Sequence, residues 1–401
     1  MVDLIPNHGN DTKCFEWEDE NNENNNVKVD ELVTHHPTWE VSYQNDTHVC
    51  FVNMNKPRTQ FLQRIYENQW YGDCTKVYTG PMWNSGWGAT IGNVANGLLK
   101  GLGNQRPFQI RLEQRQPYWI YASLKNNINS ACPTKDMFCY FLPLTNCTAS
   151  HTILKGKNAP GYGHIPTIPN NNNDDDDGTY YTPWKNRQLA RRYWLQQYVT
   201  RPQHYLRKQI YDFLQQNMTT TFQTPCIVIH VRRSDVIFDR SPRRYYSIAD
   251  YLQKIPSQFQ QQNTTNNTNI FLLTDDANAI DEALEFHPEY HWMFTPKQRY
   301  RGSEGGVQNH IPSQNPAVEV ITILAEMELV KRCNLFIGSV SGFSDVIHEE
   351  MKIKDKTIQR INVEDNKHII YNMNNAKSEE ELNHHIKQLR KNKTLTTQHN
   401  N

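Results

Sequence analysis

The chain has 401 residues, enough for two domains of ordinary size, and its 42 Lys and Arg residues balance 42 Asp and Glu residues. A formal net charge of zero argues against the basic face that a binder of nucleic-acid phosphates needs, so we expect no nucleic-acid partner. The hydrophobic fraction of 37% is low because tracts rich in Asn and Gln dilute the core.

Residues 1–38 are acidic and rich in Asn, a composition typical of a disordered or stem-like tail. The N-terminus has neither the basic start nor the apolar run of a signal peptide. No stretch approaches the ~20 apolar residues that a membrane-spanning helix needs. We therefore identify no membrane anchor in this chain.

Residues 39–221 are predicted to form an N-terminal α/β domain. Helical spacing of apolar residues covers 61–70 and 91–101, and a strand follows at 106–110. The glycines of the second helix weaken it but would let it pack closely on a sheet. Residues 170–178 contain four consecutive aspartates, which we interpret as a solvated low-complexity loop and not as a metal site.

Residues 226–229 are an apolar run after Pro225, and His230, Arg232 and Arg233 follow. This pattern predicts a buried parallel strand that ends in charged side chains. Ligands of open α/β sheets bind at the carboxyl ends of the strands, and two guanidinium groups there suit a diphosphate. The alternative is an ordinary surface ion pair with Asp235.

The same pattern recurs twice within residues 222–375. One strand, 269–274, ends in an acidic pair, and another, 334–338, ends in a turn with two serines. Helices are predicted at 277–286, at 316–333 and from about residue 343, and a capping box at 247–250 starts another. The alternation indicates a second α/β domain with a parallel sheet, and residues 376–401 read as a terminal helix and disordered tail.

These motifs, in this order, resemble the α1,6-fucosyltransferase family, whose members fucosylate the N-glycan core or nodulation chitooligosaccharides. The resemblance covers roughly residues 70–352. It implies a GT-B-like fold of two Rossmann-like domains that face a nucleotide-sugar cleft. The domain of residues 39–221 would form the acceptor side, and that of residues 222–375 would bind the GDP-sugar. It further implies inverting, metal-independent transfer of L-fucose from GDP-fucose to a glycan, with no cofactor, in the Golgi lumen or elsewhere in the secretory pathway.

The resemblance also implies a role for each motif residue. Arg232 would stabilise the leaving β-phosphate and Arg233 would support the same strand end. Ser341 or Ser339 would donate a hydroxyl hydrogen bond to the β-phosphate, and His230 and Glu326 would contact the guanine base. Asp275 and Asp276 would form an acidic pair that lines the nucleotide site. Asp235 would orient the arginines.

The general base is where the sequence departs from the family. The lysine expected after the motif's aspartate is Val236, and the glutamate a few residues later has no clean equivalent. Asp239 is the nearest carboxylate, although a different carboxylate could serve. A catalytically inactive protein that binds a GDP-sugar or a glycan on the same fold is therefore the alternative. The motifs leave the acceptor and its linkage open.

The cysteines cluster before residue 150 and form no CxxC pair, so we predict no zinc site and favour an oxidising compartment. Reduced thiols in a cytosolic protein are the alternative. By the resemblance, Cys74 pairs with Cys132. Cys139 with Cys147 and Cys14 with Cys50 are plausible further bridges. Cys226 and Cys333, at the ends of apolar segments, are predicted to be buried free thiols.

Overall fold

The computed structural model describes residues 56–82, 86–111, 119–122, 136–147, 194–218, 221–233, 245–260, 268–301, 314–352 and 357–364. The predicted tails at 1–38 and 376–401 and the loop at 170–178 lie outside these ranges. The chain divides into two compact units, and the boundary between Gln215 and Gln216 falls inside helix α4 (His204–Asn217). Thr357 onward belongs to the second unit.

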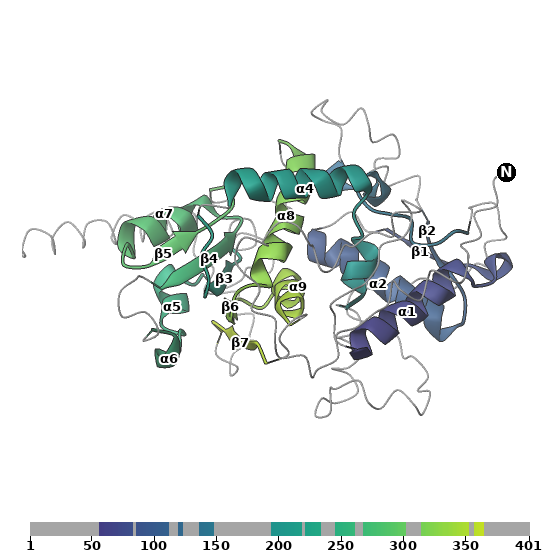
Figure 1. Ribbon diagram of the computed structural model, residues 1–401, viewed down its shortest axis with the longest axis horizontal. Helices are drawn as coiled ribbons and strands as arrows, with labels where there is room; N and C mark the ends of the chain where they lie inside the picture. Colours follow the sequence, from purple (N-terminus) through teal and green to yellow (C-terminus); the bar gives the residue numbers. More distant parts are fainter. Residues whose placement is uncertain are drawn as a thin grey trace, which may run out of the picture. The chain divides into compact units, whose positions relative to one another are not determined.

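The first unit combines helices with a two-stranded parallel sheet (Figure 1). Its main elements are α1 (Lys56–Trp70), β1 (Tyr78–Pro81), α2 (Trp87–Gly103) and β2 (Phe108–Arg111). The helices and the strand predicted from the sequence are confirmed, since they fall on α1, α2 and β2. The described part of this unit also contains helical residues 194–199, most of α4 and three short 3₁₀ turns: Cys74–Lys76, Ile120–Ala122 and Met137–Cys139.

Close packing of α2 on β2 depends on glycine, as the sequence predicted. A Cβ atom at Gly97 would lie 2.2 Å from the Phe108 ring, and one at Gly101 would lie 2.8 Å from the Arg106 carbonyl oxygen. The helix therefore approaches the strand more closely than any side chain at these positions would allow.

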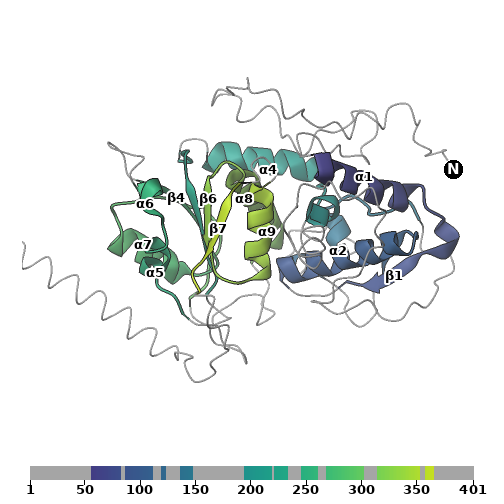
Figure 2. The same ribbon diagram turned by 90° about the horizontal axis from the view of Figure 1, so that it is seen from below.

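The second unit contains a five-stranded parallel sheet in the order β5-β4-β3-β6-β7 (Figure 2). The strands are β3 (Ile227–Val231), β4 (Asn269–Thr274), β5 (His291–Met293), β6 (Leu335–Gly338) and β7 (Gln359–Asn362). The helices are α5 (Ile248–Leu252), α6 (Ser257–Gln260), α7 (Ala277–Phe286), α8 (Pro316–Val330) and α9 (Gly342–Met351). The predicted α/β class with parallel strands is confirmed.

Helices cover both faces of this sheet: α5, α6 and α7 lie on one side and α8 and α9 on the other (Figures 1 and 2). Ile229 and Val231 of β3 belong to a buried cluster with residues of α5 and α7. His230 instead contacts Phe343 and Ser344 of α9. Successive side chains of β3 thus point to opposite faces, as the pleat of a strand requires.

The disulfides correct the predicted pairings. Cys74 pairs with Cys147, which excludes both Cys74–Cys132 and Cys139–Cys147. Cys139 is also disulfide-bonded. Cys226 and Cys333 are not free thiols, because they form a buried disulfide. Cys226 directly precedes β3, and Cys333 lies two residues before the adjacent strand β6. The Asn334 N–H between Cys333 and β6 donates to the Cys226 carbonyl oxygen at 2.9 Å. Cys14, Cys50 and Cys132 lie outside the described residues.

Within the ranges that the structure describes, no helix is both long and apolar enough to cross a bilayer.

Candidate active site

The carboxyl ends of three neighbouring strands meet at one edge of the second sheet. Val231 of β3 pairs with Thr274 of β4, and His230 pairs with Gly338 of β6. Arg232 therefore follows its strand at the same level as Asp275. The side chains of these two residues form an ion pair. The arginine motif, the acidic pair and the serine turn thus lie next to one another.

Arg232 is the arginine of the motif that remains at the surface of this edge. Its side chain is 17% exposed and that of Asp275 is 30% exposed. The Arg232 guanidinium also donates from Nη1 to the Arg233 carbonyl oxygen at 3.1 Å. The ion pair and this hydrogen bond orient the guanidinium while leaving it accessible.

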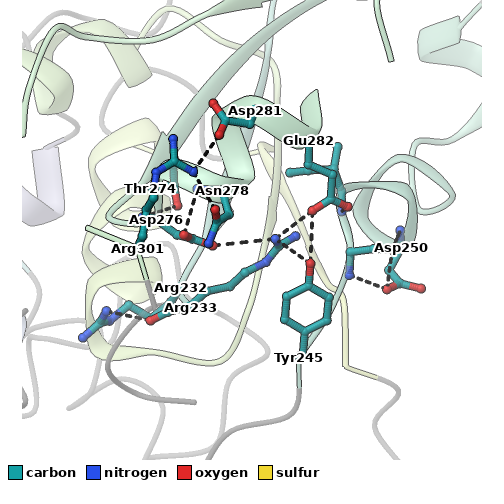
Figure 3. Close-up of polar contacts among 12 residues, drawn as sticks. Arg232, Arg233, Tyr245, Asp250, Thr274, Asp276, Asn278, Asp281, Glu282 and Arg301 are labelled. Carbon is teal, nitrogen blue, oxygen red and sulfur yellow. Dashed lines mark hydrogen bonds and ion pairs between the residues drawn. The ribbon is translucent and has the colours of Figure 1, made fainter. Parts of the chain in front are cut away.

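Arg233 is buried in a polar cluster, with its side chain only 2% exposed (Figure 3). Its Nη1 donates to Glu282 Oε2 at 2.8 Å and to the Tyr245 hydroxyl at 3.0 Å, and it lies 3.7 Å from Asp276 Oδ2. The guanidinium also stacks over the Tyr245 ring, 4.4 Å from its centroid. Its Nε and Nη2 atoms have no hydrogen-bond partner within the described part of the chain.

The charges of this cluster reinforce one another. Burial alone would lower the pKa of Arg233, but Glu282, Tyr245 and Asp276 outweigh it and leave the pKa above its ordinary value. Burial raises the pKa of Asp276, and Arg233 offsets part of that rise. Arg233 is therefore a permanent cation with a structural set of anionic partners.

The two arginines do not form a single fork around one ligand, as we had expected from the sequence. Figure 3 shows the Arg232 guanidinium pointing away from that of Arg233. The pleat explains the divergence, because adjacent residues at a strand end point to opposite faces. Arg233 has the orientation of Val231, toward α7, and Arg232 points to the other side. Arg232 alone of the pair presents its guanidinium at the edge.

The serine turn connects β6 to α9. Ser341 Oγ accepts a hydrogen bond from the Ser344 N–H at 3.0 Å, and Ser344 Oγ lies 2.7 Å from His230 Nδ1. A Cβ atom at Gly338 would lie 2.6 Å from the Phe336 ring and 3.2 Å from Ser344 Oγ, so glycine lets α9 begin this close to the strand. Sequence reasoning missed Ser344, which links the predicted residues His230 and Ser341.

Ser339 lies in the same turn and is buried. Its N–H donates to the His230 carbonyl oxygen at 3.4 Å, and its hydroxyl lies near that of Tyr251.

A carboxylate missed by the sequence analysis lies beside this turn. The Val340 N–H donates to both oxygens of Glu364, each at 3.0 Å. The pairing of Gly338 with Asn362 explains the contact, because it places Glu364 beside Val340 where β6 and β7 end. A backbone donor at this turn is thus engaged by an anion of the chain itself.

Glu326 of α8 is completely buried, and both of its carboxylate oxygens are occupied. Thr295 Oγ1 donates to Oε1 at 2.5 Å, and Lys297 Nζ lies 2.9 Å from Oε2. Both partners follow β5 and were not identified from the sequence. The structure therefore places Glu326 in an ion pair beneath the surface.

The other predicted residues, Asp235 and Asp239, lie outside the described residues. Among the residues that are described, no group of three or more His, Cys, Asp or Glu side chains could hold a metal ion.

Comparison with known families supports the resemblance found in the motifs. Residues 192–301 match the family described as Alpha-(1,6)-fucosyltransferase N- and catalytic domains, so the resemblance is confirmed over that stretch. The match includes β3, β4 and α7, the elements that carry both arginines and the acidic pair. No curated protein sequence matches the chain.

Among solved structures, the chain is similar to three fucosyltransferases at low identity. NodZ from Bradyrhizobium is 14% identical, with a TM-score of 0.35, and the match covers 68% of this chain and 92% of that one. An Arabidopsis thaliana FUT1 variant in complex with GDP is 14% identical, with a TM-score of 0.39, and the match covers 77% of this chain and 75% of that one. POFUT1 in complex with GDP-fucose is 10% identical, with a TM-score of 0.36, and the match covers 72% of this chain and 98% of that one.

Proposed function

We propose, from the match of residues 192–301 to the α1,6-fucosyltransferase family, that this protein transfers L-fucose from GDP-fucose to a glycan hydroxyl. The acceptor class that the resemblance suggests is GlcNAc of an N-glycan core or of a chitooligosaccharide, fucosylated through an α1,6 linkage with inversion. The disulfides Cys74–Cys147 and Cys226–Cys333 support a location in the secretory pathway.

The observation that carries the proposal is the position of the Arg232 guanidinium. It lies at the carboxyl edge of a parallel sheet, where such folds bind nucleotides, and it pairs with Asp275 at the end of the neighbouring strand β4. Transfer breaks the bond between fucose and the diphosphate, so negative charge grows on the β-phosphate. A guanidinium fixed at that phosphate stabilises the transition state more than the bound substrate.

The remaining polar groups of the edge divide the other tasks. The serine turn and the start of α9 offer hydroxyl and N–H donors for phosphate oxygens. His230 contacts the Ser344 hydroxyl through its Nδ1 atom. Asp275 orients Arg232 through their ion pair. Arg233 supports the motif from beneath the surface, and its Nε and Nη2 donors, which have no partner among the described residues, contribute positive potential there.

Inversion requires a base that removes the proton from the acceptor hydroxyl. We assign this role to Asp239, the nearest carboxylate after the motif, and we assign to Asp235 the orientation of the arginines. No metal is needed in this scheme, because a guanidinium and N–H groups stabilise the negative charge of the diphosphate.

The test is a transfer assay by mass spectrometry. The purified chain is incubated with GDP-fucose and a panel of N-glycans and chitooligosaccharides, with and without EDTA. We expect one acceptor class to gain the mass of one deoxyhexose, equally in both conditions. Binding of GDP without a product on any acceptor would instead indicate the inactive GDP-sugar-binding protein.

A further inference from the structure

We infer that Glu282 is a positioning residue for the donor diphosphate: it fixes Arg233 and, through Arg233, the orientation of Arg232. The inference rests on the proposed function, because it assigns Glu282 a part in the same donor site. Glu282 belongs to none of the motifs that identified that site in the sequence.

Glu282 joins three separate parts of the second unit through one buried carboxylate (Figure 3). Its Oε2 accepts from Arg233 Nη1 at 2.8 Å and from the Tyr245 hydroxyl at 3.2 Å. Its Oε1 accepts from the Ile248 N–H at 2.6 Å, at the start of α5. The end of β3, Tyr245 and α5 are therefore held to the middle of α7 by a single side chain.

The connection to Arg232 passes through the backbone. The carbonyl oxygen of Arg233 accepts a hydrogen bond from Arg232 Nη1 at 3.1 Å. Because the Arg233 side chain is held at its far end by Glu282, its peptide group has little freedom to rotate. The carbonyl that supports the Arg232 guanidinium is therefore fixed as well.

Glu282 also binds the two described residues on either side of residues 234–244. Arg233 directly precedes that stretch and Tyr245 directly follows it, and both donate to the same oxygen of Glu282. Arg232, the proposed phosphate-binding residue, lies two positions before the stretch. One carboxylate thus determines the separation of its two ends.

Stability alone is a weak reason for this arrangement. A buried carboxylate loses its hydration, and apolar residues of similar volume often stabilise a protein as well as a buried ion pair does. What an ion pair adds is a defined geometry, since the planar guanidinium is held in one orientation. A donor site that aims a cation at one phosphate has a use for that geometry.

The experiment compares the binding of GDP and GMP, measured by calorimetry on the full chain. GMP lacks the β-phosphate that Arg232 is proposed to contact, so a positioning defect should weaken only GDP binding. The variants are Glu282→Gln, Arg232→Ala and their combination. Glu289→Gln is the matched control, because Glu289 is exposed and follows the same helix.

For the wild type we expect GDP to bind more tightly than GMP. Glu282→Gln should weaken GDP binding by about 10-fold, the scale of one charged hydrogen bond, and leave GMP binding within about 2-fold. In the Arg232→Ala background, Glu282→Gln should cost almost nothing further, because the residue it acts through is already gone. Glu289→Gln should match the wild type for both nucleotides.

Equal weakening of GDP and GMP, or independent losses that multiply in the double variant, would overturn the inference and leave the proposed function intact. If the wild type binds GDP no more tightly than GMP, the donor site itself is wrong. Should Glu282→Gln fail to fold, Tyr245→Phe replaces it, since this change removes one hydroxyl from the cluster and keeps the ring. A GDP-specific loss of about 3-fold is expected there. An unchanged ratio of GDP to GMP affinity would overturn the inference.

Discussion

Replacing Arg233 with methionine tests the buried cluster behind the proposed site. Met has a similar length and no charge, so the substitution leaves Glu282 and Asp276 buried without their cation. Removing one partner of a buried ion pair costs about 3–5 kcal/mol. The contacts give the same scale, since Nη1 makes two hydrogen bonds, at 2.8 and 3.0 Å, and bonds to charged groups contribute about 1.5–3 kcal/mol each.

This loss is a large part of the ~5–15 kcal/mol by which a typical domain is stable. Urea unfolding measures it, and hydrogen exchange of β3 and α7 amides assigns it to the second unit. Arg301→Met is the matched control. Arg301 is 51% exposed in its ion pair with Asp281, so its loss should cost only about 0–1 kcal/mol. A loss below about 1 kcal/mol for Arg233→Met would refute the reasoning.

The pH dependence of the same variant provides a second check. Burial already raises the pKa of Asp276, and of the groups that lower this pKa Arg233 has the largest effect. Without Arg233 the folded-state pKa rises further above the usual 3.8, so the folded state holds the proton more tightly than the unfolded state. The stability deficit should therefore be complete above the folded-state pKa and should shrink as the pH falls toward 3.8. A deficit that grows in acid would contradict this assignment.

Three further changes test separate parts of the structure. Cys226→Ala combined with Cys333→Ala should lower the free energy of unfolding by about 3–5 kcal/mol, because the bridge closes a sequence separation of 107 residues; an unchanged urea midpoint would argue against that bridge. Gly97→Ala should cost about 1–3 kcal/mol, since its Cβ atom would lie 2.2 Å from the Phe108 ring, and a melting temperature equal to that of the wild type would contradict the packing of α2 on β2. Glu364→Gln should raise GDP affinity by about 2–5-fold in calorimetry, because it removes an anion from the Val340 N–H beside the phosphate site; weaker binding would instead show that Glu364 assists the donor.

The centre of the second unit's sheet was predictable because its strands β3, β4 and β6 are buried on both faces. Such strands appear in the sequence as short apolar runs, and each of β3, β4 and β6 has one. The polar residues directly after these runs were predicted to meet at one edge, and the ion pair of Arg232 with Asp275 confirms that two of the three ends do. The capping box at Ser247 and Asp250 was also confirmed.

Partners from distant elements were not predictable from local pattern. Glu282 lies in the middle of α7 and looks like any acidic residue of a helix until its packing against β3 is known. Lys297 and Glu364 follow the edge strands β5 and β7, whose places depend on the strand order. The Cys226–Cys333 disulfide needed the same knowledge, since its residues meet only because β3 and β6 are neighbours.

The divergence of the two arginines could have been anticipated. Alternation along a strand predicts that Arg232 and Arg233 point to opposite faces, and Val231 already identifies the face that is packed against α5 and α7. The expectation that both guanidinium groups bind one diphosphate ignored this alternation of side chains at the end of the strand. The pleat assigns Arg233 to the interior and leaves Arg232 to meet the ligand.

The turnover of GDP-fucose by the Arg232→Ala variant tests the central claim most directly. GDP release is measured for this variant beside Arg301→Ala, which removes an exposed guanidinium of the same unit. We predict that Arg232→Ala lowers turnover by about 10²–10³-fold while the folded state persists, because it removes the donor aimed at the leaving phosphate. Arg301→Ala should stay close to the wild type. Undiminished turnover by Arg232→Ala would contradict the account.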